Sequence, residues 1–337
     1  KKIFMILAKF FIGIITHHLI NKILLKKKLL FDDPKYSSHK NFVNLNDNIV
    51  LSGGIVFLLL FIFFCDASIG LLLFIFLIFF VGIISDLKIL NLPSLRFLLQ
   101  FLIISYFVYT LDLGVSSTDL KYLDIFLKNK YISLLFSVLC ILVLINGSNF
   151  FDGLNTLMIG YYVLVFSSII ILIKIFNISY DVEFLISIIL ILSVILLFNF
   201  FNKSFLGDSG AYAVSCLAGY VCIDFYNDIK DLSVLFIVVI LWYPAFETLF
   251  SIIRKLQLRY NPTKPDNNHL HHYFYIFLKK KIKNNYQANL IAANSINLFN
   301  LIIFGFSIFF YKNSFMLLII LLINLIVYLS SYKILKK

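Results

Sequence analysis

Residues 49–86 read IVLSGGIVFLLLFIFFCDASIGLLLFIFLIFFVGIISD. This stretch holds two almost wholly apolar runs, residues 49–65 and 68–85, and Asp66 is its only charged residue before the terminal Asp86. A helix that crosses a bilayer needs about 20 apolar residues, with about 17 as the practical minimum. Two such runs in succession therefore predict a pair of transmembrane helices.

Apolar runs of the same kind recur along the whole chain. Hydrophobic residues make up 61% of the 337 residues and charged residues only 14%, whereas about a quarter of a soluble domain is charged. We predict an all-α polytopic membrane protein, with residues 1–337 forming a single transmembrane domain. The first run continues to about Leu25 without a small-residue cleavage site, so we expect an anchor rather than a signal peptide. The ten or eleven expected transmembrane helices cover residues 3–24, 49–65, 68–85, 95–111, 131–147, 157–176, 184–200, 208–225, 231–250, 289–310 and 314–333.

The distribution of Lys and Arg predicts the orientation of these helices. With eleven spans, five connections and the C-terminal tail share one side of the membrane. Twenty of the 29 Lys and Arg residues lie in or beside these segments, eight lie on the opposite side, and Lys9 lies within the first span. Cytoplasmic segments carry the excess of Lys and Arg, so we predict that the shared side is cytoplasmic, although Lys1 and Lys2 fall on the other side. The five connections are residues 26–48, 86–94, 148–156, 201–207 and 251–288.

The unusual polar clusters of the chain fall on the same predicted side. The orientation was derived without them, so their coincidence on one face indicates a site at the cytoplasmic surface of the membrane. The clusters are Asp32-Asp33-Pro34 with Ser37-Ser38-His39, Ser52-Gly53-Gly54, Ser85-Asp86-Leu87-Lys88, Asn149 to Gly153, Gly207-Asp208-Ser209-Gly210, and Pro265 to His272.

Several of these residues also have a purely structural interpretation. Asp86 ends an apolar run, where a charge normally marks the water boundary. Asp208 or Ser209 is suited to cap the helix that follows, and Asn149 and Asp152 are placed to do the same for the next helix. Each of these interpretations stays open at this stage.

The histidine cluster is harder to explain as an ordinary loop. Three of the six histidines, His269, His271 and His272, fall within four positions beside an acidic residue and several lysines. They lack the helical i, i+4 pairing of common zinc motifs, so zinc is not favoured. His17 and His18 lie inside the first span, and we assign them no role.

Together the clusters suit a phosphate-bearing ligand. Carboxylates and an Asn amide are ligands for a hard cation such as Mg²⁺, with Mn²⁺ as the alternative, which is usually shared with substrate phosphates. His, Lys and Arg beside them suit a diphosphate. The net charge of +12 is spread along the membrane edges, so it indicates anchoring to membrane lipid rather than a nucleic-acid partner.

Seven segments carry a resemblance to a known family: DDPKYSSH (32–39), SGGI (52–55), GIISDLKILNLPSLRFLLQ (82–100), NGSNFFDGLNTL (146–157), FLGDSGAY (205–212), PAFETLFSIIRK (244–255) and NPTKPDNNHLHH (261–272). In this order they resemble the polyprenyl-phosphate N-acetylhexosamine-1-phosphate transferases of glycosyltransferase family 4, which are related to the phospho-MurNAc-pentapeptide transferase. The resemblance implies transfer of an N-acetylhexosamine 1-phosphate from a UDP-sugar to undecaprenyl phosphate, with Mg²⁺ and release of UMP. It further implies a bacterial inner membrane, an active site facing the cytoplasm, and the first membrane step of an O-antigen, capsule or similar cell-surface glycan.

The resemblance also implies residue roles. Asp208 is the implied metal carboxylate, assisted by Asn149, and Asp86 is the second catalytic carboxylate, acting at the acceptor phosphate or the metal. The remaining implied residues bind substrate: Asp152 and Asn155 contact the nucleotide, Lys88 adds positive charge, and Arg254, His269, His271 and His272 hold the donor diphosphate or sugar.

Three positions depart from the family pattern. The paired Asp-Asp after the third span is here Ser85-Asp86, and Glu247 stands where many relatives have Asp. The Arg expected in the first motif is absent, and Lys35 or Lys40 is its candidate substitute. Loss of one carboxylate is tolerable in principle, because a phosphate monoester has a second pKa of about 6 and is already mostly dianionic at neutral pH.

Two other functions remain as alternatives. A transporter would place its ionisable residues near the middle of the bilayer in broken helices, whereas here they cluster at one interface. A catalytically silent relative would be expected to lose Asp208 and the histidines as well. The sequence leaves open which N-acetylhexosamine is used, which glycan is made, and whether the protein forms a homodimer.

Overall fold

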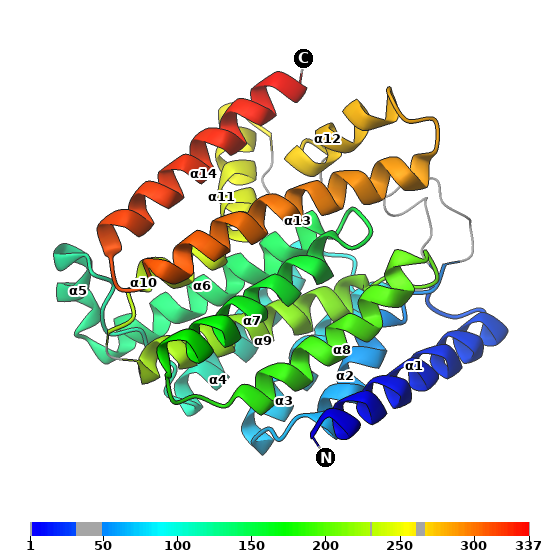
Figure 1. The fold of residues 1–337 in the computed structure, drawn as a ribbon, viewed down its shortest axis with the longest axis horizontal. Coiled ribbons are helices and arrows are strands. Elements are labelled where there is room, and N and C mark those ends of the chain that lie inside the picture. The colour runs from blue at the N-terminus through cyan, green and yellow to red at the C-terminus, as the bar shows by residue number, and fades with distance from the viewer. Residues whose placement is uncertain (1, 32–48, 230, 261–266, 337) are drawn as a thin grey trace.

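The computed structural model describes residues 2–31, 49–229, 231–260 and 267–336. Within these residues the chain forms fourteen α-helices and two isolated β-bridges, with no strand (Figure 1). The prediction of an all-α fold is confirmed. The helices are α1 (Lys2–Lys27), α2 (Gly53–Phe64), α3 (Ile69–Asp86), α4 (Pro93–Thr110), α5 (Lys121–Leu127), α6 (Lys130–Phe151), α7 (Leu157–Phe176), α8 (Val182–Phe200), α9 (Gly207–Asp228), α10 (Val234–Ile240), α11 (Trp242–Gln257), α12 (Leu270–Lys279), α13 (Asn285–Phe309) and α14 (Ser314–Leu335).

Eight of the described helices are long and apolar enough to cross a membrane: α1, α3, α4, α6, α7, α8, α13 and α14. The pair α10–α11 becomes a ninth when it is counted as one span, although its halves meet at an angle of 75°. The polytopic architecture is thus confirmed, and each of the eleven predicted spans coincides with a described helix or with this pair. Three of them, α2, α9 and α10–α11, are not simple spans.

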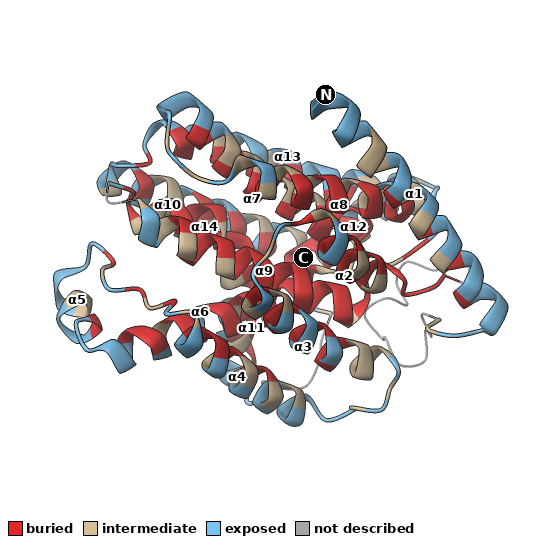
Figure 2. Ribbon diagram, turned by 90° about the horizontal axis from the view of Figure 1, so that it is seen from below, coloured by how far each residue is buried: buried red, intermediate tan, exposed pale blue. Residues whose placement is uncertain are grey.

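These departures have local causes. α2 has only 12 residues, because the segment before it leaves the helix and pairs with the connection before α9. α9 has 22 residues but is not among the strongly apolar helices, because its first turns, GDSGAYAVSCLAG, consist mostly of small residues. Small residues let helices approach closely, and sixteen residues of α9 are buried beneath its neighbours, which include α2, α3 and α6 (Figure 2).

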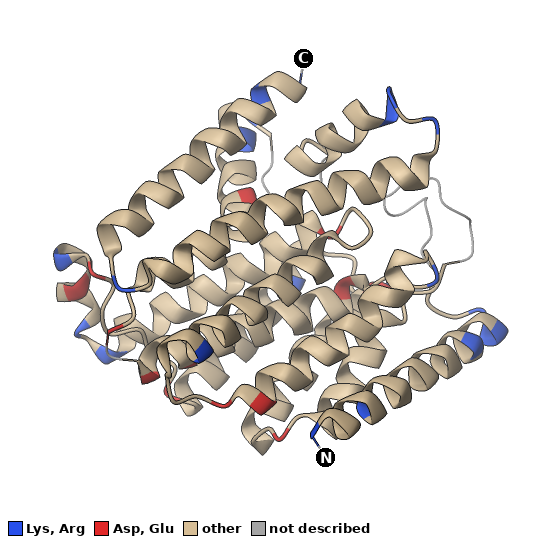
Figure 3. Ribbon diagram, viewed as in Figure 1, with Lys and Arg blue, Asp and Glu red and all other residues tan. Residues whose placement is uncertain are grey.

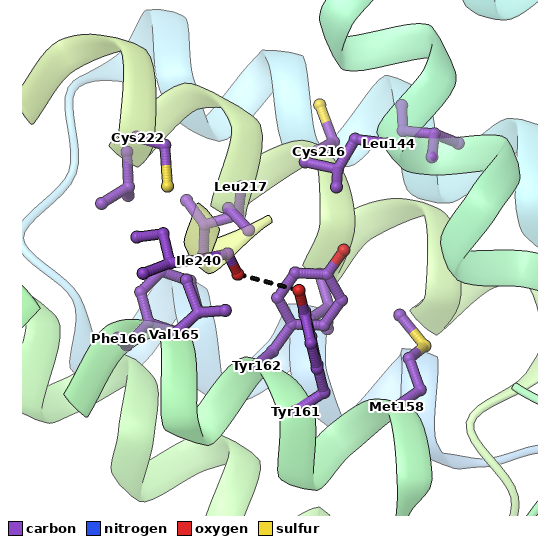
Figure 4. Close-up of a cluster of buried hydrophobic side chains, with 14 of the residues drawn as sticks. Leu144, Met158, Tyr161, Tyr162, Val165, Phe166, Cys216, Leu217, Cys222 and Ile240 are labelled. Carbon is purple, nitrogen blue, oxygen red and sulfur yellow. Dashed lines mark hydrogen bonds between the residues drawn. The ribbon is translucent and has the colours of Figure 1, made fainter. Parts of the chain in front are cut away.

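The break between α10 and α11 is stabilised by side chains from other helices. The Tyr161 hydroxyl donates to the Ile240 carbonyl oxygen at 2.8 Å, within a cluster of buried apolar side chains (Figure 4). The Trp242 indole donates to Asn300 Oδ1 at 2.9 Å. Backbone groups freed inside a membrane must find partners within the protein, and the Tyr161 contact supplies one at this bend.

Gly82 lets α3 and α9 approach closely. A Cβ atom at this position would overlap the backbone of Ser209. Gly82→Ala is therefore expected to push the two helices apart and to lower the free energy of unfolding by about 1–3 kcal/mol, measured as a lower thermal-unfolding midpoint in detergent. Gly305→Ala is the control, because a Cβ there meets no atom within 4 Å. Equal stability of the two variants would contradict this packing.

The outer helices present apolar side chains outward. On α1, α4 and α14 the exposed residues include Phe4, Tyr106 and Ile326, each more than 60% exposed. Figure 2 shows the same division, with exposed residues along the outer helices and buried residues in the centre. Such an apolar surface is expected where a protein contacts lipid.

The connections gather at the two ends of the bundle. At one end Gly53 N–H donates to Phe205 O at 3.0 Å, which joins the segments that precede α2 and α9. At the other end the exposed Lys2 and Glu183 form an ion pair. The first end carries the lysines of the last turns of α1 and α14 and of the α12–α13 connection (Figure 3). Residues 32–48 and 261–266 lie outside the described part of the chain, and with them the first predicted motif and half of the last.

Candidate active site

Asp86 is the last residue of α3, and its carboxylate caps a different helix. Asp86 Oδ1 accepts from Asp208 N–H at 2.8 Å, and Oδ2 accepts from Ser209 N–H at 3.0 Å. Gly207, the first residue of α9, has φ of +75°, and a Cβ there would lie 2.7 Å from Asp86 Oδ2. The first amides of a helix lack partners within the helix and favour a negative charge. The cap that the sequence suggested for Asp208 or Ser209 is therefore supplied by Asp86 from α3.

Asp208 lies in the first turn of α9, beside two groups from other helices. Its Oδ2 atom accepts from Ser85 Oγ at 2.7 Å and from Arg96 Nη1 at 3.0 Å, and Arg96 Nη1 also donates to Ser85 Oγ at 2.7 Å. The side chains of Arg96 and Asp208 are 24% and 26% exposed, so a substrate can reach them. Ser85, the departure from the family pattern, thus links the carboxylate to the guanidinium.

Arg96, in the first turn of α4, is a site residue that the sequence analysis did not assign. Its residue type could have indicated a role in the site, because only three of the 29 Lys and Arg residues of the chain are arginines. A guanidinium has a fixed, planar set of donors that suits carboxylates and phosphates, which a lysine ammonium does not reproduce.

The connection between α6 and α7 lies against the histidines. α6 ends about one turn beyond the predicted span 131–147, so Asn149 lies in its last turn. The half-buried Asp152 follows the helix. A Cβ on Gly153 would lie 2.7 Å from His272 Nε2 and 3.0 Å from His271 Nε2. The absence of a side chain at Gly153 therefore lets this connection contact the imidazole rings directly.

Asn155 is buried and braces the same connection. Its Nδ2 donates to Asn199 O at 3.0 Å and to Asn202 Oδ1 at 3.1 Å, and its backbone N–H donates to Asn289 Oδ1 at 2.9 Å. These contacts hold the start of α7 against α8 and α13. The nucleotide contact expected of Asn155 stays a prediction.

The three histidines form one buried cluster at the start of α12. Neighbouring rings lie 4.2–5.7 Å apart between centroids. His269 Nδ1 lies 3.2 Å from Glu247 Oε2, and His271 Nδ1 lies 3.7 Å from Glu247 Oε1. Burial lowers the pKa of the His271 imidazole below its usual value, because desolvation disfavours the charged ring. The structure thus places His269, His271 and His272 in one cluster, and two of these rings lie beside Glu247. Their role in holding the donor stays a prediction.

Arg254 and Lys88 lie at the edges of the two clusters. Arg254 Nη1 donates to the Tyr332 hydroxyl at 3.0 Å and to the Asn268 carbonyl, which connects α11 to α14 and to the histidine segment. Lys88 follows α3 with φ of +61°, and its N–H donates to Ser85 O at 2.8 Å.

The C-terminal end of α6 lies against the histidine cluster. α6 packs against both α9 and α11. Its residue Phe150 lies 5.6 Å from the His269 ring between centroids, and the Lys255 ammonium lies 5.7 Å from the Phe150 ring centroid. Carboxylates, a guanidinium and imidazoles therefore share one end of an apolar bundle.

The described residues do not form a complete protein cage for a metal. Outside the gaps at 32–48, 230 and 261–266, no group of three or more His, Cys, Asp or Glu side chains could hold a metal ion. Mg²⁺ that is bound together with substrate phosphates commonly uses only one or two carboxylates. The partly exposed carboxylate of Asp208 fits a cation that is bound in this way.

Comparison with known proteins shows a similarity to one family. The model of glycosyl transferase family 4 matches residues 68–226, which hold Asp86, Arg96, Asn149, Asp152, Asn155 and Asp208. Over this segment, slightly less than half of its length, the chain is similar to glycosyl transferase family 4. The resemblance found in the sequence motifs is confirmed.

Two relatives in this family have curated names. A probable undecaprenyl-phosphate N-acetylglucosaminyl 1-phosphate transferase of Bacillus subtilis is 27% identical over 206 residues, which cover 58% of this chain and 55% of the relative. An undecaprenyl-phosphate alpha-N-acetylglucosaminyl 1-phosphate transferase of Thermotoga maritima is 33% identical over 72 residues, which cover 21% of this chain and 23% of the relative. The chain thus matches about half of the first relative's length and less than a quarter of the second's.

Proposed function

We propose that this protein transfers an N-acetylhexosamine 1-phosphate from a UDP-sugar to undecaprenyl phosphate and releases UMP. The observation that carries the proposal is the cluster of Asp86, Asp208 and Arg96 at the same end of the helical bundle as the histidines, in a bundle with an apolar exterior. A water-soluble nucleotide sugar and a lipid phosphate can meet at such a boundary. The names of the two relatives support the same reaction. The product would initiate a cell-surface glycan such as O-antigen.

The chemistry requires positioning and charge neutralisation more than proton transfer. An oxygen of the acceptor phosphate attacks the phosphorus that carries the sugar, a new P–O bond forms, and the bond to UMP breaks, so UMP leaves with the electron pair. The acceptor is mostly dianionic at neutral pH, because its second pKa is about 6. Phosphoryl transfer depends largely on orienting the reactants and stabilising their charge.

The residues divide into two groups. Asp208, with Asn149 beside the site, would hold Mg²⁺, which neutralises charge on the diphosphate when bound, and Asp86 keeps the start of α9 and hence Asp208 in place. Arg96 and Lys88 add positive charge for the acceptor phosphate. The donor is assigned to Asp152 and Asn155 for the nucleotide and to Arg254, His269, His271 and His272 for the diphosphate or sugar.

The direct test is to incubate the purified protein in lipid nanodiscs with undecaprenyl phosphate, Mg²⁺ and a panel of UDP-N-acetylhexosamines. UMP release that requires both substrates, together with a sugar-diphosphate lipid product, is expected. The panel identifies the sugar. Absence of UMP with every donor would contradict the proposal.

The orientation is a separate prediction. We expect the end that carries the site to face the cytoplasm, because the predicted connections and tail on that side hold 20 of the 29 Lys and Arg residues and cytoplasmic segments carry the positive excess. A reporter inserted at residues 280–284 should report the cytoplasm, and one inserted at residues 114–118 should report the opposite side. The reversed pattern would separate the site from cytoplasmic nucleotide sugars.

The bent pair α10–α11 favours transport as a second candidate, because broken helices line the binding sites of many transporters. A transporter would move labelled UDP-sugar into proteoliposomes without forming UMP. Transfer chemistry without uptake is the outcome that we expect.

A further inference from the structure

Glu247 is a fully buried carboxylate in the middle of α11. Its Oε2 atom accepts from the Tyr328 hydroxyl of α14 at 2.8 Å and lies 3.2 Å from His269 Nδ1. Its Oε1 atom accepts from Leu270 N–H at 3.3 Å. One carboxylate therefore joins α11, α14 and the first residues of α12.

A buried carboxylate needs hydrogen bonds or an opposite charge to remain ionised. In the described part of the chain no Lys or Arg forms an ion pair with Glu247, and its partners are the histidine segment and Tyr328. A carboxylate that accepts from Nδ1–H of an imidazole fixes the tautomer and orientation of the ring and makes it more basic. Glu247 therefore controls how His269 is presented, and the Leu270 contact fixes the start of α12.

The last helix supports the same segment at a second point. Tyr332, one turn after Tyr328, accepts from Arg254, and its ring lies 5.3 Å from that of Tyr273 between centroids. α14 lies outside residues 68–226, the segment that matches the family model. The family match therefore assigns no role to Tyr328 and Tyr332.

We propose that Glu247 and Tyr328 are positioning residues, which hold His269 in the orientation that binds the donor diphosphate. The donor role of His269 rests on the proposed function, whereas the anchoring of the α12 start by Glu247 does not. The C-terminal helix thus supports donor binding through a tyrosine–carboxylate–histidine series.

The experiment compares Glu247→Gln and Tyr328→Phe with two matched controls. Tyr180 donates to Asp224 Oδ2 at 2.8 Å at the opposite end of the bundle, so Tyr180→Phe and Asp224→Asn remove the same chemical groups far from the histidines. We expect Glu247→Gln to lower kcat/KM for the UDP-sugar by about 10-fold or more and Tyr328→Phe by about 3- to 10-fold. The KM for undecaprenyl phosphate and the activities of both controls should change little.

A double-mutant cycle separates positioning from general stabilisation. If Glu247 acts through His269, Glu247→Gln should have little further effect in a His269→Ala background. Glu247→Asp, which keeps the charge, should retain more activity than Glu247→Gln. Full additivity of the two losses, or equal losses in the Asp224→Asn control, would overturn the proposal.

Hydrogen exchange provides a readout that does not depend on activity. Glu247→Gln should accelerate exchange in peptides that cover residues 267–275, because the Leu270 amide and His269 lose a charged acceptor, and Asp224→Asn should not. If the wild-type protein released no UMP with any donor, the proposed function would fail, and the exchange data would still decide the anchoring. Unchanged exchange in Glu247→Gln would overturn it.

Discussion

Replacement of Asp208 by Asn is expected to lower turnover by about 100-fold or more. The carboxylate is a partly exposed anion of the site, and one of its oxygens accepts hydrogen bonds from both Ser85 and Arg96. An amide of the same shape cannot supply the charge that a cation on the donor diphosphate requires. The measurement is UMP release at saturating concentrations of both substrates.

Asp224→Asn is the control for this prediction, because it makes the same change in the same helix at the opposite end of the bundle. Both variants should insert in the membrane and elute in detergent like the wild type. Turnover of Asp208→Asn within a few-fold of the control would remove Asp208 from the proposed metal site.

The spans could be predicted from the sequence because long apolar runs have few other uses. The apolar pattern is least informative for a helix that is surrounded by protein. α9 is built of small residues that pack against α3 at Gly82 and against Gly54 of α2, so its low hydropathy reflects its central position. The break between α10 and α11 was missed although the sequence holds a local signal for it, because Pro244 has no N–H to donate to the Ile240 carbonyl oxygen. The partner that satisfies this oxygen, Tyr161, is distant in the sequence.

For the candidate site, the sequence indicated motifs and not the contacts between them. The alternation of spans was enough to place Asp86, Asp208 and the histidines at one end, and the structure brings each of these groups together with neighbours. Three contacts each join residues on different helices that are 81 to 123 positions apart in the sequence. They are the cap of Asp86 on α9, the ion pair of Arg96 with Asp208, and the hydrogen bond of Tyr328 to Glu247. No local pattern indicates such contacts.

Asp86→Asn is expected to be far more damaging than Ser85→Ala. Both oxygens of Asp86 accept backbone amides at the start of α9, and an Asn side chain keeps only one acceptor and turns an NH₂ group toward the second donor. Loss of such a charged cap costs about 1–2 kcal/mol, and it displaces Asp208, the neighbouring residue of the proposed metal site. We expect turnover to fall by about 10-fold or more.

Ser85→Ala should change turnover by no more than about 3-fold, because the direct contact between Arg96 and Asp208 at 3.0 Å remains when the hydroxyl is removed. The comparison also tests the departure of this chain from the paired carboxylates of the family that it resembles. If the acceptor phosphate loses its second proton near pH 6 without help, activity should rise through that range and then level off, with Ser85 in place. Ser85→Asp should then give little gain, because it adds a second negative charge beside Asp208. An inactive wild type that gains turnover from Ser85→Asp would mean that the missing carboxylate is required, and that the native chain is a silent relative.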